Sequence, residues 1–182
     1  MRSTHTPIAV TLLALTAATA ASAQVGVSLT NVNNSAQLTG YVTQDVKADT
    51  VNDWTSAAIV LELDAGSIYQ DGFGNDAEPN PAFFSYFPSL EFDTYLAGGP
   101  MGVGILGAGG DAGGEAYQFD NLGLDASWRS NSPLDVGLTR IARVTLTDDA
   151  SGTWRLAVMQ ADDETRHDFT GTIVNGVMAV DP

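Results

Sequence analysis

The sequence contains no cysteine. This absence excludes disulfide bonds, thiol catalysis and thiolate zinc sites. Histidine is almost as scarce. His5 lies near the N-terminus, and His167 is the only other histidine in the sequence. A serine triad or a histidine metal site would therefore depend on His167. The charged residues around it predict a surface turn, and no G-x-S-x-G nucleophile motif accompanies it.

Basic residues are also few, with 7 Lys and Arg against 22 Asp and Glu, for a formal net charge of −15. A surface this acidic repels nucleic acid phosphates and anionic lipid headgroups, so neither is an expected partner. Cations, polysaccharides and extracellular proteins are the remaining candidates. The simplest interpretation of the charge is solubility.

Beyond residue 23 the chain has no apolar run near the roughly 18 residues of a spanning helix. The first 23 residues differ, since Arg2 precedes the apolar stretch Ile8 to Ala18, and Ala21-Ser22-Ala23 resembles a signal peptidase site. We therefore predict a signal peptide over residues 1–23 and one exported domain over residues 24–182. That domain has six basic and 22 acidic residues, for a formal net charge of −16. The expected location is secreted, with the periplasm or cell surface as alternatives and no membrane insertion after leader removal.

The rest of the chain has the pattern of short strands joined by turns. Apolar and polar residues alternate with period two, and no segment sustains a 3.6-residue apolar stripe. Asn175-Gly176 is typical of a type I′ hairpin turn, and the glycine-rich residues 98–116 predict a loop or a loosely paired excursion. The expected strands cover residues 57–63, 138–147, 154–158, 169–174 and 177–180. This pattern favours an all-β fold, an antiparallel β-sandwich, with a closed barrel as the alternative.

Five segments carry a resemblance to a known group of proteins: DWTSAAIVLEL (53–63), GSIYQDGFGNDAEPNPAFF (66–84), FPSLEFDTYL (87–96) and the closing SGTWRLAV and GTIVNGVM. In these segments the chain resembles a little-characterised group of exported bacterial proteins, common in planctomycetes. Their fold is a cohesin-like or carbohydrate-module-like, jelly-roll-like β-sandwich. The resemblance implies a binding or assembly role outside the cell and assigns no catalytic residue.

Residues 71–78 carry the strongest chemical signal. Asp71, Asn75, Asp76 and Glu78 place several oxygen ligands on a glycine-containing loop, and calcium prefers such ligands. We therefore name these four residues as a candidate calcium site, although the spacing is not that of an EF-hand. A solvated turn stiffened by the following prolines is the alternative interpretation.

The densest group of aromatic residues lies between residues 83 and 95. Sugar-binding modules stack exposed rings on pyranose faces. Alternation predicts that most of these rings are in the core, whereas polar or turn-like surroundings predict exposure for Tyr86, Tyr95 and Trp128. These three are the candidate ligand-binding residues.

The sequence offers no convincing catalytic constellation. Glu91 and Asp93 are expected on one face of a strand, about 7 Å apart, where a glycosidase could use two carboxylates. Residues 102–107 match G-x-G-x-x-G, but no helix pattern follows. We therefore expect a non-catalytic binding or structural module that recognises a polysaccharide or a partner protein. The alternatives are a glycoside hydrolase-type enzyme and an envelope or matrix component.

The leader generates the first testable prediction. Signal peptidase should cut after Ala23, because small residues occupy the positions that the enzyme reads. Mass spectrometry of the exported product should find an N-terminus at or near Gln24. A protein retained in the cell with residues 8–18 intact would contradict both the compartment and the mature length.

Overall fold

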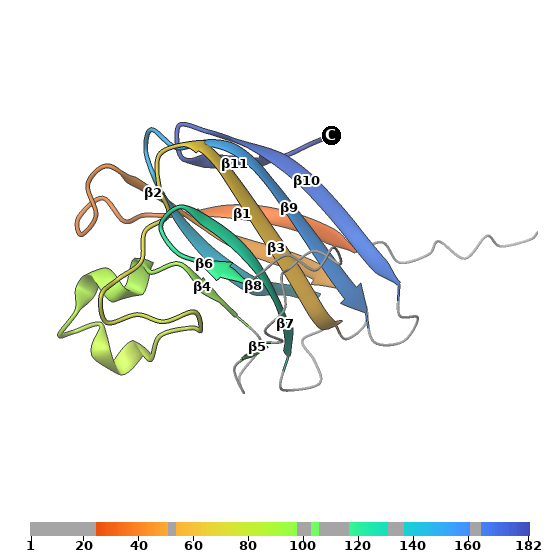
Figure 1. Cartoon of the computed structure of the whole chain (residues 1–182). Helices are drawn as coiled ribbons and strands as arrows, with labels where there is room; N and C mark the ends of the chain where they lie inside the picture. The colour runs from red at the N-terminus through yellow and green to blue at the C-terminus, as the bar shows by residue number, and fades with distance from the viewer. Residues whose placement is uncertain (1–24, 51–53, 98–102, 106–116, 131–136, 161–164) are drawn as a thin grey trace, which may run out of the picture.

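The computed structural model describes residues 25–50, 54–97, 103–105, 117–130, 137–160 and 165–182, so the predicted leader lies outside the described residues. The fold is all-β. Two antiparallel sheets pack against each other as a β-sandwich, which confirms the predicted class (Figure 1). In the described part of the chain, no helix is long and apolar enough to cross a membrane.

The smaller sheet has four strands in the order β1-β2-β8-β4. Its strands are β1 (Gly26–Val32), β2 (Tyr41–Thr50), β8 (Gly137–Thr147) and the short β4 (Tyr95–Leu96). Every neighbouring pair is antiparallel. In Figure 1 this sheet lies behind the larger one.

The larger sheet has the order β11-β10-β9-β3-β7-β5, and β6 also pairs with β7. The short β5 lies within the glycine-rich residues 98–116, of which the structure describes only part. The strands of this sheet are β3 (Trp54–Ala65), β5 (Val103–Ile105), β6 (Gln118–Phe119), β7 (Gly123–Ser130), β9 (Ser151–Gln160), β10 (Arg166–Val174) and β11 (Val177–Val180).

The core fills the space between the two sheets. Alternate residues of each central strand point into it, as the period-two pattern predicts. Trp154, Leu156 and Val158 of β9 are buried, and Ile59 and Leu61 of β3 face the same core. The sequence pattern therefore assigned the inward faces of these two strands correctly.

In β8, a bulge overturns part of the predicted alternation. Val46 pairs with Ala142 but the next residue of β2 pairs with Arg140, so Ile141 is an extra residue. An extra residue reverses which face the preceding side chains point to. Leu138, predicted to face inward, is consequently 59% exposed, whereas Ile141 is fully buried. The bulge also places Arg140 and Arg143 on the same outer face.

The final hairpin is closed by the predicted type I′ turn, with φ values of 51° at Asn175 and 74° at Gly176. Two buried side chains tie its last strand to the rest of the protein. The Gln44 amide bonds to both backbone groups of Met178, and Trp154 Nε1 donates to the Ala179 carbonyl at 3.0 Å.

Burial of Trp154 generates a prediction about stability. Trp154→Ala should lower the free energy of unfolding by about 3–5 kcal/mol, because apolar contacts are lost and a cavity remains. Trp154→Phe, which keeps most of the ring volume but loses the N–H donor, should cost less. Urea denaturation of both variants measures the difference. A loss below about 1 kcal/mol for the alanine variant would contradict a central role for this ring.

Candidate binding loop

The candidate site is the loop of residues 66–94, which joins β3 to β4 (yellow-green in Figure 1). It contains two short 3₁₀ turns, η1 (Pro81–Phe83) and η2 (Pro88–Phe92). Proline at the start of each turn presets the backbone φ. Asn80 caps η1 by accepting a hydrogen bond from Ala82 N at 3.0 Å. These local signals define the turns, and tertiary contacts hold the loop in place.

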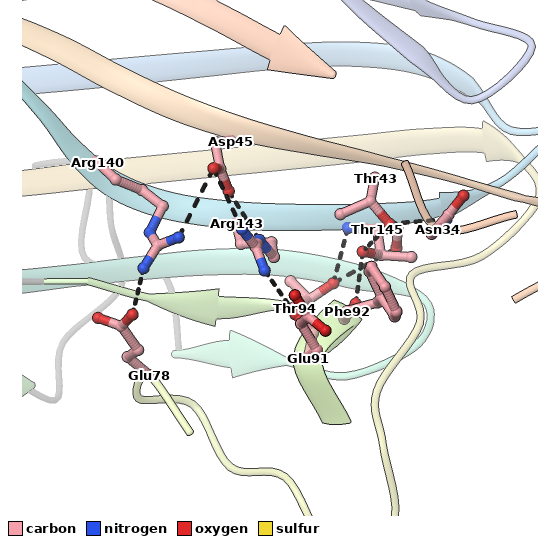
Figure 2. Close-up of polar contacts among 10 residues, drawn as sticks. All are labelled: Asn34, Thr43, Asp45, Glu78, Glu91, Phe92, Thr94, Arg140, Arg143 and Thr145. Carbon is pink, nitrogen blue, oxygen red and sulfur yellow. Dashed lines mark hydrogen bonds and ion pairs between the residues drawn. The ribbon is translucent and has the colours of Figure 1, made fainter. Parts of the chain in front are cut away.

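Arg143 on β8 is the main anchor of the loop. Its guanidinium donates to both carboxylate oxygens of Asp45, at 2.7 and 3.2 Å, and to the Glu91 carbonyl at 2.6 Å (Figure 2). It also lies 5.6 Å from the ring centroid of Tyr95. A buried guanidinium needs such partners because burial removes its hydration. The sheet supplies the Asp45 carboxylate and the loop supplies the Glu91 carbonyl, and together they satisfy the buried guanidinium.

A second anchor is a relay of hydrogen bonds across the outer face of the smaller sheet. Asn34 donates to Thr43, Thr43 shares a 2.9 Å bond with Thr145, and Thr145 donates to the Phe92 carbonyl at 2.6 Å (Figure 2). The backbone N–H of Thr145 in turn donates to Thr94. These residues are buried, so each hydroxyl needs a partner, and the loop supplies two of them.

Aromatic rings cover the outer part of the same loop. Phe73, Phe83 and Tyr86 are 69%, 52% and 77% exposed. Phe73 stacks on Phe87, with ring centroids 4.2 Å apart. The Phe83 carbonyl accepts hydrogen bonds from the backbone of both Tyr86 and Phe87, so a single turn holds three of the rings. We call Phe73, Phe83, Tyr86 and Phe87 the aromatic patch.

The aromatic patch differs from the sequence prediction. Tyr86 is exposed as predicted, but Tyr95 and Trp128 are buried, at 2% and 0% exposure, and offer no ring face to a ligand. Tyr95 packs in β4 beneath two arginines, and Trp128 Nε1 donates to the Ala97 carbonyl. Polar neighbours in sequence misled the prediction. Along β7 they lie on the opposite face of the strand from Trp128, and the residues that cover Tyr95 come from β8, far away in the sequence.

Phe73 and Phe83 are the exposed rings that the sequence analysis missed. Phe73 lies between Gly72 and Gly74 in a polar segment, a context that indicates a turn, and this signal could have identified it. Phe83 was assigned with the core rings because it sits in an aromatic run. The 3₁₀ turn that exposes it has no strand periodicity.

The structure gathers three of the four predicted calcium ligands. Asp71, Asn75 and Asp76 line one small cavity together with Asp93. Glu78 instead forms an ion pair with Arg140 (Figure 2). Hydroxyl groups already donate to the aspartates, from Ser89 to Asp71 and from Tyr117 to Asp76. Among the described residues, no three acidic or histidine side chains are arranged to hold a metal ion.

Asp93 is the most unusual ionisable group at this cavity. It is 1% exposed, and a Cβ on Gly74 would collide with its carboxylate. The pKa of Asp93 is raised to about 7, mainly by burial and also by the charges of Asp71 and Asp76, while hydrogen bonds from the backbone of Asp71 and Thr94 act in the opposite direction. In Asp71, burial also raises the pKa, but hydrogen bonds from Ser89, Phe73 and Tyr69 outweigh it and lower the pKa overall.

The predicted acidic pair Glu91 and Asp93 is not formed as expected. Glu91 lies in η2 and is exposed, whereas Asp93 ends that turn and is buried, so the two carboxylates share no strand face. His167 lies in β10 rather than in a turn, with Nε2 3.3 Å from the Gln160 amide nitrogen. At Glu91 and Asp93, the 3₁₀ turn η2 takes the place of the strand that the alternation predicted.

No protein-family model matches the chain, and no curated protein matches it either.

Asp93 generates a prediction about pH. Between about pH 4 and pH 7 the folded protein holds a proton on Asp93 that the unfolded chain has released, so the free energy of unfolding should fall as the pH rises through this window. Asp93→Asn should remove that part of the dependence. Urea denaturation at both ends of the window tests it.

The control for this measurement is Asp149→Asn, which removes one negative charge from an exposed turn. It should keep the pH dependence of the wild type. If the two variants changed the pH dependence equally, general charge repulsion rather than burial of Asp93 would be responsible.

Proposed function

We propose that this protein is an exported, non-catalytic glycan-binding module and that the aromatic patch is its binding surface. The observation that carries the proposal is the stacked pair Phe73–Phe87 beside the exposed rings of Phe83 and Tyr86. Exposed aromatic faces fit the apolar C–H faces of sugar rings. The signal peptide expected over residues 1–23 would bring the patch to polysaccharides outside the cell.

The construction of the loop supports this proposal. Folding by itself favours burying rings and exposing carboxylates. The 66–94 loop follows this rule at Ile68, Leu90 and Phe92, which are buried. It departs from the rule by burying Asp93 and Thr94 while Phe73 and Tyr86 face solvent. An arrangement that is unfavourable for the free protein is typical of a binding surface.

The charge of the protein narrows the class of glycan. Asp71, Asn75, Asp76 and Asn80 lie on the same loop as the rings and offer oxygen acceptors for hydroxyl or amino groups. A net charge of −15 disfavours acidic polysaccharides. Neutral or amino-sugar polymers are therefore the expected ligands. The proposal includes no calcium ion, because Glu78 is paired with Arg140 and, in the described part of the chain, no three acidic or histidine side chains are arranged to hold a metal ion.

The patch generates a binding prediction. Phe73→Ala and Tyr86→Ala should each weaken glycan binding by about 2- to 12-fold, since a stacked ring contributes roughly 0.5–1.5 kcal/mol. A glycan array should identify the ligand, and titration calorimetry should measure the affinity, expected between roughly millimolar and micromolar for a site of two or three rings.

The matched control is Val174→Ala, which shortens an apolar side chain that is 59% exposed on β10. It should leave glycan affinity unchanged. Binding that survives both ring variants would contradict the proposed surface. If the protein bound no glycan on the array, an assembly role would replace the proposed function.

A further inference from the structure

The outer face of the larger sheet has a floor of small side chains. Ala58 of β3 pairs with Ala157 of β9 and with Ser127 of β7, so three small residues form one row across the sheet. A depression of about 250 Å³ lies over Ala58 and Ala157 of this row and is bordered by Val60, Arg155 and Arg166, among others. Small side chains in this row let another surface approach the sheet closely there.

The same face carries half of the six basic residues that follow residue 23. Arg129, Arg155 and Arg166 all lie on it, together with the acidic residues Glu62, Asp125 and Asp168 and with Asp181, whose carboxylate accepts from the Thr170 hydroxyl. The face therefore holds half of these basic residues but only a small share of the 22 acidic ones, and it is less negative than the rest of a protein whose net charge is −15. Like-charged copies repel each other least where each presents its least negative face.

The charges are also ordered along the strands. At one end, Arg129 and Arg166 lie in the row of Ser56. At the other end, Asp125 lies in the row of Val60 and Glu62 one row further, beside Arg155. With Asp168 counted at the first end, that end carries a net charge of +1. The other end is net negative, because Asp181 lies beside Thr170 in the row of Val60.

We propose that this face binds a second copy of the chain through a two-fold axis that runs across the strands. Such an axis reverses the strand direction and sets β7 of one copy over β7 of the other. Arg129 of each copy then lies over Asp125 of its partner, and the two small-residue floors meet. A self-complementary patch of this kind is what a two-fold interface requires. Charge complementarity favours this occupant over an acidic or a basic partner.

Sedimentation equilibrium of the purified protein tests this proposal. The wild type should show a monomer–dimer equilibrium that weakens as salt is raised, because salt screens charge pairs near the surface. Arg129→Glu and Asp125→Arg should each weaken the dimer by about tenfold or more, since each places like charges opposite one another. The double variant exchanges the two charges and should restore the dimer.

Lys47→Glu is the matched control, because it makes the same charge change on β2 of the smaller sheet. It should leave the dimer intact, and thermal melts should confirm that every variant folds. A wild type that stays monomeric at all concentrations would overturn the proposal. Loss in the single variants without recovery in the double variant would overturn the two-fold pairing, and loss of glycan binding in Ala58→Arg would assign this face to glycan instead.

Discussion

The guanidinium of Arg143 is the point on which the rest of the structure depends. It joins the Asp45 carboxylate of one strand to the Glu91 carbonyl of the 66–94 loop, above the ring of Tyr95. Removing one partner would leave a buried charge unpaired, which costs about 3–5 kcal/mol in comparable pairs. The sheet and the loop therefore hold each other in place. Without this contact the loop that carries the aromatic patch would lose its main anchor.

The loop shows how a small region can be stable and still present a surface for binding. Its inner side combines buried apolar residues, Leu90 and Phe92 among them, with polar groups: the Asp93 carboxylate and the hydrogen bonds to Thr145. Hydrogen bonds that are all satisfied specify one arrangement of the backbone. In that arrangement the rings of Phe73 and Tyr86 are not packed in the core and face solvent.

The two sheets differ in what their outer faces do. The 66–94 loop covers part of the outer face of the smaller sheet and buries Asp45 and Thr145 there. The larger sheet instead keeps a row of small residues on its outer face, with basic and acidic residues towards opposite ends of its strands. The aromatic patch and this face lie on different elements, so the proposed glycan site and the proposed contact with a second copy do not compete. Under both proposals, a dimer would present two weak glycan sites and would bind a polymer more tightly than one copy does.

By itself, the sequence determined the all-β class, the inward faces of β3 and β9 and the final type I′ turn. Period-two alternation and Asn175-Gly176 are local signals that tertiary contacts did not override. Tertiary structure decided the bulge at Ile141. In the sequence it shows only as a break in the alternation, with Arg140 at an apolar position and Ile141 at a polar one, and such a break does not by itself indicate an extra residue. Tertiary structure also decided that Trp128 is buried and Phe73 exposed. Burial of a single ring depends on which distant segment covers it, and residues far apart in the chain supply that cover.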